Sequence, residues 1–227
     1  MKIKHPLVKG EVVEIKPRVY CVMVDDNYDR AMLFCRYQEF YESPYKQFRG
    51  KPFTWAEYMR FYKNDRKENV FTYPYDWSGY NIPSNIMQRA NHIFCKDTEY
   101  DQIMNDIYFY CAIDSQNKNN GTRCDWYLIG ASSKDLKTMD HEIAHGLYFT
   151  NKEYKKSVKK LIETIKPKHY DTLKKKLIKM GYADDEKIID DEIQAFMSTG
   201  LYNTFDNETF KKYEKEFIKN FKLFNKS

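Results

Sequence analysis

Two histidines four residues apart, with a glutamate directly after the first, form the motif with the clearest chemistry: His141-Glu142-Ile143-Ala144-His145. Residues four apart lie one turn from each other on the same face of a helix, so His141 and His145 can offer imidazole nitrogens to one metal ion. Glu142 is the next residue around that helix, close enough to accept a proton from a water at the metal. The spacing therefore predicts a catalytic metal site with Zn²⁺ as the cofactor.

A catalytic zinc site needs a third protein ligand, and Glu192 is the carboxylate best placed to supply it. No histidine follows His145 within a dozen residues. Glu192 shares an expected helix face with apolar residues, among them Ile189, Ala195 and Phe196. A carboxylate on an apolar face is costly to bury unless a cation meets it, and a zinc ion would do so. The alternative is a structural glutamate paired with a lysine.

With this ligand set the chain resembles the gluzincin branch of the zincin metallopeptidases, in which HExxH lies on one helix and a glutamate ligand on a later helix. The resemblance covers residues 124–200 and implies hydrolysis of peptide bonds in a peptide or protein substrate. In thermolysin-like members an aspartate four residues after the ligand glutamate orients a zinc histidine, and here Phe196 stands at that position. A carboxylate for that role would have to come from Asp140, Asp190 or Asp191.

The chemistry implied by the resemblance also needs a hydrogen-bond donor, besides the zinc, for the oxyanion that forms during hydrolysis. Some gluzincins place a tyrosine shortly before the third ligand, and Tyr182 is the nearest equivalent in this chain. Its rivals are Tyr148, which is seven residues after His141 and so on the same helix face, and Tyr202. The expected catalytic residues are therefore Glu142, as the general base, and Tyr182.

Two other functions fit the same residues. A zincin-fold module whose metal is structural or absent would serve as an interaction surface and catalyse nothing. A zinc hydrolase of a non-peptide amide would use the same metal and the same base on a different substrate.

The strand expected before the motif would carry its helix into position. Residues Trp126–Ala131 are aromatic and aliphatic, Ile107–Ile113 have the same character, and Asn120-Gly121 between them is a turn signal. The pattern predicts a hairpin whose second strand runs into the metal-binding helix, and an extended peptide substrate paired with the free edge of that strand. After the motif the periodicity predicts helices over residues 152–166, 168–180, 185–200 and 206–224.

The first hundred residues predict two strands and three capped helices. The strands cover residues 12–15 and 19–24, and the helices cover 27–42, 55–62 and 85–92, with caps at Asp26, Thr54 and Ser84. An aromatic loop at 71–83 would line a groove or close a core. We therefore expect an α+β fold with an N-terminal accessory or lid region, 1–100, and a zincin-like catalytic region, 101–227. The catalytic region would hold a small mostly antiparallel sheet, the HExxH helix and a helical C-terminal part.

The composition of the 227 residues limits compartment and partners. No run of about 18 apolar residues is present, and the N-terminus has no secretory signal, which predicts a cytoplasmic protein without a membrane partner. The five cysteines are scattered and never paired as CxxC, which fits a reducing compartment. The net charge is +5, and the lysine-rich stretch 155–179 indicates a solvated face, not a nucleic-acid site.

Overall fold

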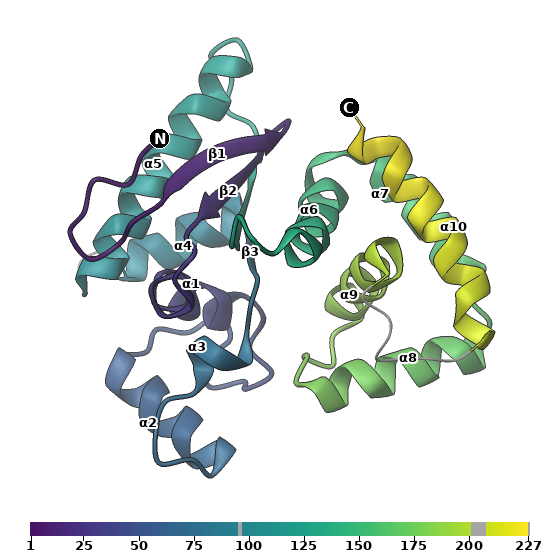
Figure 1. The fold of residues 1–227 in the computed structure, drawn as a ribbon, viewed down its shortest axis with the longest axis horizontal. Coiled ribbons are helices and arrows are strands. Elements are labelled where there is room, and N and C mark those ends of the chain that lie inside the picture. Colours follow the sequence, from purple (N-terminus) through teal and green to yellow (C-terminus); the bar gives the residue numbers. More distant parts are fainter. Residues whose placement is uncertain (95–96, 201–207, 227) are drawn as a thin grey trace.

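The computed structural model describes residues 1–94, 97–200 and 208–226, and a four-stranded sheet in the order β1-β2-β4-β3 lies near its centre (Figure 1). The strands are β1 (Glu11–Lys16), β2 (Val19–Met23), β3 (Tyr80–Pro83) and β4 (Tyr127–Ala131). β1 and β2 are antiparallel, β2 and β4 are parallel, and β4 and β3 are antiparallel. The predicted α+β class is confirmed, and the sheet is mixed because its central pair is parallel.

Helices cover both faces of this sheet. On one side lie α1 (Asn27–Glu42), α2 (Trp55–Arg66), α3 (Tyr73–Asp76), α4 (Ser84–Phe94) and α5 (Glu99–Lys118). On the other side lie α6 (Leu136–Thr150), α7 (Lys152–Glu163), α8 (Pro167–Met180), α9 (Glu186–Thr199) and α10 (Glu208–Asn225), with α6 nearest the sheet (Figure 1). Among the described residues, no helix combines the length and the apolar character needed to cross a membrane.

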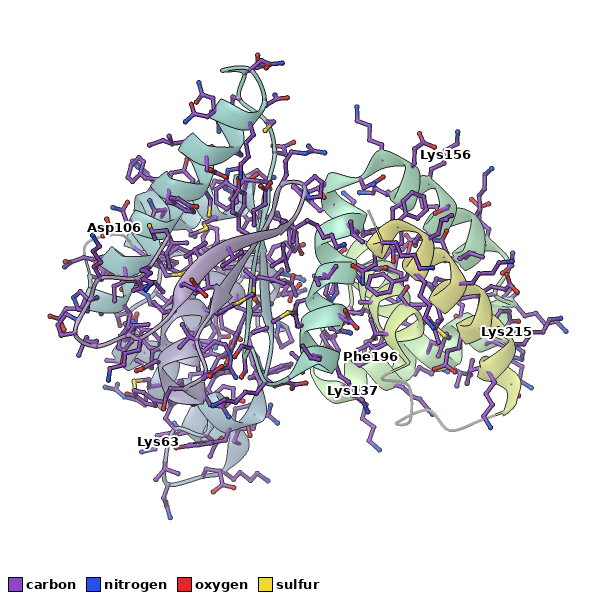
Figure 2. All side chains as sticks on the ribbon, turned by 45° about the horizontal axis from the view of Figure 1, so that its top comes forward. Lys63, Asp106, Lys137, Lys156, Phe196 and Lys215 are labelled. Atoms are coloured by element: carbon purple, nitrogen blue, oxygen red, sulfur yellow. The ribbon has the colours of Figure 1, made fainter. Side chains whose placement is uncertain are left out.

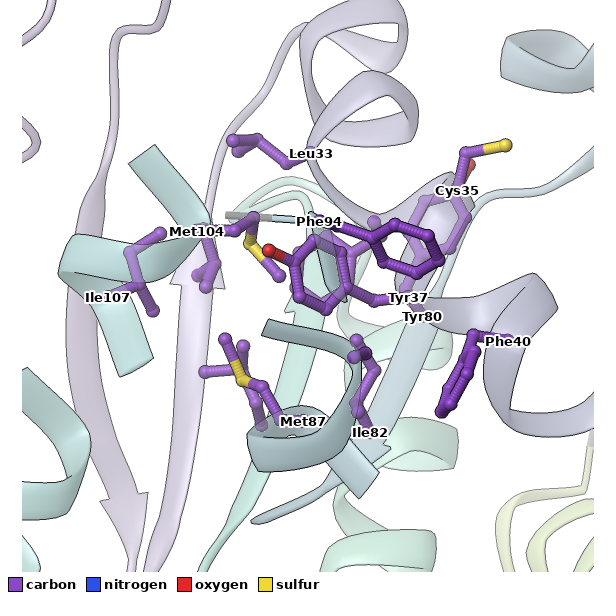
Figure 3. Close-up of a cluster of buried hydrophobic side chains, with 14 of the residues drawn as sticks. Leu33, Cys35, Tyr37, Phe40, Tyr80, Ile82, Met87, Phe94, Met104 and Ile107 are labelled. Carbon is purple, nitrogen blue, oxygen red and sulfur yellow. The ribbon is translucent and has the colours of Figure 1, made fainter. Parts of the chain in front are cut away.

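The sheet separates two apolar clusters because successive strand residues point to opposite faces. Val22 and Leu128 belong to the cluster formed with α1, α4 and α5, part of which Figure 3 shows. Their neighbours Cys21 and Ile129 belong to the cluster formed with α6 and the C-terminal helices. Burial on both faces explains why β2 and β4 have almost no polar residues.

Two N-terminal helices begin at the caps that the sequence predicts. The Asp26 carboxylate accepts a hydrogen bond of 2.9 Å from the backbone N–H of Asp29, and α1 covers the predicted residues 27–42. Thr54 and Glu57 form a reciprocal capping box at the start of α2, which continues to Arg66. In each case a side chain satisfies an N–H group that the first helical turn leaves without a partner.

The predicted strand that begins at Ile107 is wrong, because these residues belong to α5. Thr98 caps this helix by accepting a hydrogen bond from the backbone N–H of Asp101. Ile107 and Cys111 are buried at the four-residue spacing of a helix. Phe109 is 53% exposed on the outer face, and such apolar residues on both faces gave the segment its strand-like appearance. The turn signal that follows joins α5 to β4.

Both regions expected from the sequence contribute to the sheet. β1, β2 and β3 come from residues 1–100, and β4 comes from residues 101–227. Because β4 is hydrogen-bonded to β2 on one side and to β3 on the other, the two regions share one sheet and both of its apolar clusters.

α6 approaches the sheet closely at Gly146. A Cβ atom at this position would lie 2.6 Å from Cγ1 of Val19, closer than van der Waals contact allows. Gly146 directly follows the HExxH motif, so its lack of a side chain determines how near the motif lies to β2.

We predict that Gly146→Ala lowers the free energy of unfolding, although alanine favours a helix. On an exposed helix surface the change would add about 1 kcal/mol of stability. Here the clash with Val19 should cost about 1–3 kcal/mol. Urea unfolding measures the difference. Val19→Ala should recover part of the loss in the double variant, and strictly additive losses would contradict the close contact.

Candidate metal centre

α6 and α9 bring together the three residues predicted to bind a metal. His141 and His145 are 7% and 2% exposed, and their Nε2 atoms lie 3.2 Å apart. Glu192 is 2% exposed; its Oε2 lies 3.7 Å from Nε2 of His141, and its Oε1 lies 3.6 Å from Nε2 of His145. Among the described residues these three form the group of metal-binding side chains whose donor atoms all lie within 4.8 Å of one another.

These separations suit a tetrahedral zinc ion. Ligand atoms about 2.0–2.1 Å from zinc in a tetrahedral arrangement lie roughly 3.4 Å from one another. The observed distances of 3.2, 3.6 and 3.7 Å bracket that value. Oε2 of Glu192 is buried and accepts no hydrogen bond within the described part of the chain, a state that a bound cation would relieve. The side chains therefore fit a zinc ion.

Asp191 holds His145 in the orientation that metal binding requires. Its Oδ1 lies 2.8 Å from Nδ1 of His145 and also accepts a hydrogen bond of 3.0 Å from Nε2 of Gln194. The Tyr154 hydroxyl in turn donates to Oε1 of Gln194 over 2.9 Å. A carboxylate at Nδ1 favours the tautomer in which that nitrogen carries the proton, which leaves Nε2 free to bind a metal.

The other two aspartates considered for this role lie elsewhere. Oδ1 of Asp190 accepts a hydrogen bond of 2.7 Å from the Tyr170 hydroxyl, on the side of α9 that faces α8. The Asp140 carboxylate interacts with Asn225 and Lys16.

Negative charge exceeds positive charge around the two histidines. Burial lowers the pKa of His145, but the carboxylates of Asp191 and Glu192 outweigh burial, so this pKa lies well above its usual value. Such a site favours a cation, which can be a proton on the imidazole or a metal ion between the ligands.

Glu142 is not one of the three residues predicted to bind a metal, and a hydrogen bond to the sheet fixes its carboxylate. Nδ2 of Asn81, on β3, donates to Oε2 of Glu142 over 3.1 Å, and the Tyr127 hydroxyl, on β4, donates to Oδ1 of Asn81 over 2.7 Å. A Cβ atom at Gly79 would collide with Oε1 of Glu142. Burial raises the pKa of Glu142, and His141 only partly offsets this. A fixed carboxylate with a raised pKa is suited to accepting and returning a proton.

Of the three tyrosines considered for the oxyanion, Tyr182 lies at the site. Burial, together with the nearby Glu192 carboxylate, raises the pKa of Tyr182 well above its usual value, so its hydroxyl stays protonated. The Tyr148 ring lies against the ammonium group of Lys155, with Nζ 4.8 Å from the ring centre. Tyr202 lies outside the described residues.

Phe196, at the position where a thermolysin-like chain has its orienting aspartate, packs against a ligand. Its ring centre lies 4.6 Å from that of His141, with the planes at 61°. Figure 2 shows Phe196 between α6 and α9. Nδ1 of His141 is buried and has no hydrogen-bond partner among the described residues. Phe196 therefore orients His141 by packing, whereas Asp191 orients His145 by a hydrogen bond.

Three residues around Glu142 were not predicted from the sequence: Asn81 donates to its carboxylate, Tyr127 donates to Asn81, and Gly79 leaves room for it. A signal for Asn81 was present, because it is a polar residue between Tyr80 and Ile82 in a short strand with no exposed residue. A buried amide needs polar partners, so its position already indicated contact with a polar site.

The prediction that a peptide pairs with the strand Trp126–Ala131 is wrong, because β4 is hydrogen-bonded on both sides. The sheet edge nearest Glu142 is β3. The backbone N–H of Asn81 on this edge donates to Oε1 of Gln38, on α1, over 3.0 Å. The α1 side chain thus covers part of the edge that the sheet leaves unpaired.

Compared with protein-family profiles, curated proteins and solved structures, the chain has no match.

We predict that Asp191→Asn weakens zinc binding about 10- to 100-fold, because the orienting carboxylate of His145 is lost. Competition with a chelator measures the affinity. Asp190→Asn is the matched control, since Asp190 is the adjacent acid and interacts with Tyr170. An equal loss of zinc affinity in the two variants would show that zinc binding depends only on the overall negative charge of α9.

Proposed function

We propose that this protein is a zinc-dependent metallopeptidase of the gluzincin type, which hydrolyses peptide bonds in a peptide or protein substrate. The spacing of the donor atoms of His141, His145 and Glu192, beside a separately held Glu142, carries this proposal. Two histidines and one carboxylate are a known ligand set of catalytic zinc, and a nearby glutamate outside that set can serve as the base.

Zn²⁺ held by these ligands would polarise the substrate carbonyl and make the attacking water more acidic. Glu142 accepts a proton from that water as the water oxygen bonds to the carbonyl carbon. It then gives the proton to the amine nitrogen as the C–N bond breaks, so each cleavage consumes one water. Asn81 positions Glu142 for both transfers through its hydrogen bond of 3.1 Å.

Tyr182 is the side chain that we assign to the oxyanion. Its raised pKa keeps the hydroxyl protonated, so that it can donate a hydrogen bond as negative charge develops on the carbonyl oxygen. Its place beside Glu192 puts this donor next to one of the three ligands.

We predict that Glu142→Gln abolishes peptide hydrolysis while the protein keeps its zinc. Glutamine has nearly the same shape but cannot accept the proton of the water, and this general-base step contributes roughly 100- to 10,000-fold in rate. Cleavage of a peptide library, followed by mass spectrometry, measures the activity, and elemental analysis measures the zinc.

Glu153→Gln, an exposed change on α7, is the control and should cleave like the unaltered protein. Undiminished cleavage by Glu142→Gln would refute the assigned base. A zinc-loaded protein that cleaves no peptide would refute the peptidase function.

We predict that Gly79→Ala lowers kcat at least about tenfold with little loss of zinc or of thermal stability. The added methyl group would push the Glu142 carboxylate away from its place, and small displacements of a catalytic group are costly. The groups that the added methyl would meet, the Glu142 carboxylate and the Thr138 methyl, are ends of side chains and not backbone, so we expect the fold to adjust by moving them. Unchanged kcat in Gly79→Ala would show that the position of Glu142 is not constrained from this side.

A further inference from the structure

A small hollow borders the candidate catalytic site on the side of α1. Its lining includes Gly79, which touches Glu142, and Tyr182, which faces Glu192. From α1 it includes Glu39 and Glu42. The hollow therefore adjoins both catalytic-site carboxylates, within reach of a side chain close to a bond being cleaved.

Two acids of α1, Glu39 and Glu42, line this hollow, and burial raises the pKa of both carboxyl groups. Glu39 is 6% exposed, and the nearby hydroxyls of Ser43, Tyr58 and Tyr73 only partly offset the effect of burial on its carboxyl group. Neither Glu39 nor Glu42 forms an ion pair with any described lysine, arginine or histidine. The amide of Gln38 donates a hydrogen bond to Oε1 of Glu42 and supplies no charge. An ionised carboxylate is costly to bury without a cation beside it, so an ammonium group in the hollow would stabilise the charged form of both acids.

Aromatic rings form the walls around these carboxylates. Tyr73, Trp77 and Tyr182 all line the hollow. The Trp77 ring centre lies 6.3 Å from that of Tyr73 and 6.2 Å from that of Tyr182. Aromatic faces attract ammonium and guanidinium groups, and their apolar surface accommodates a methylene stem.

The size of the hollow limits what can enter it. Its volume is about 40 Å³, enough for the centres of about three water-sized groups in a row. The last two methylenes and the ammonium group of a lysine are three such groups. A second metal ion fits poorly, because the described residues group only His141, His145 and Glu192 closely enough to share one.

We propose that this hollow is a specificity pocket that binds a lysine side chain of the substrate near the bond to be cleaved, with Glu39 and Glu42 binding its ammonium group. The proposal rests on the peptidase function and narrows its substrate class. Charge-assisted hydrogen bonds from an ammonium group would satisfy the carboxylate oxygens, and the methylene stem would lie along the aromatic walls.

Glu39→Gln isolates the pocket from the metal site. Burial raises the pKa of Glu39, which the hydroxyls of Ser43, Tyr58 and Tyr73 and the charge of Arg66 only partly offset. A carboxyl group whose pKa is raised by folding destabilises the folded state as the pH rises through that pKa. Glutamine at position 39 should therefore leave the melting temperature at pH 8 unchanged or raise it. Loss of lysine binding in this variant would then not come from unfolding.

The experiment measures the affinity of peptides for the zinc-loaded Glu142→Gln protein, which is expected to bind peptides without cleaving them. The peptides are acetylated, amidated hexapeptides with lysine, arginine, norleucine, glutamine or glutamate at each position in turn. We expect lysine at one position to improve affinity over norleucine at least about tenfold. Adding Glu39→Gln should remove that preference, while adding Glu68→Gln, an exposed control, should not.

Equal binding of lysine and norleucine peptides, or no binding of any peptide, would overturn the pocket. A lysine preference that survives Glu39→Gln together with Glu42→Gln would overturn it as well. Parallel cleavage assays of the unaltered protein separate the two proposals. Lysine-dependent binding without cleavage would refute only the peptidase function, and cleavage without lysine preference would refute only the pocket.

Discussion

Two carboxylates and two imidazoles are buried together where α6 meets α9 and the sheet, with the partly exposed Asp191 beside them, and the rest of the site depends on balancing their charge. Asp191 and Glu192 raise the pKa of His145 against the effect of burial, so the fold already favours a cation there. A zinc ion would neutralise this charge without a proton on either ligand nitrogen. Binding of the ion and packing of α9 against α6 are therefore expected to stabilise each other.

The grouping of His141, His145 and Glu192 could be predicted because each part of it is a local pattern. HExxH needs only the four-residue spacing of one helix, and Glu192 interrupts an apolar helix face on which Ile189, Ala195 and Phe196 are buried as expected. Asp191 was one of three candidates for the carboxylate that orients a histidine. Which of them reaches Nδ1 of His145 depends on how α9 is rotated against α6. The contact between Asn81 and Glu142 joins residues 61 positions apart in the sequence, so no local pattern predicts it.

The errors also have physical causes. The stretch from Ile107 has apolar residues on its exposed face as well as its buried face, and this obscured the helical period of α5. The strand before the motif was expected to have a free edge because sequence periodicity reports which faces of a strand are buried, not which edges are hydrogen-bonded. β2 and β3 occupy its two edges, and both come from distant parts of the chain.

The central place of β4 also limits how the protein can be divided. All five residues of this strand are buried, and both of its hydrogen-bonding partners lie before residue 100. A fragment that begins at residue 101 would keep every metal ligand, yet would present an apolar strand with two open edges, a typical seed for aggregation. Residues 101–227 are therefore expected to need the strands contributed by residues 1–100 to form a soluble unit.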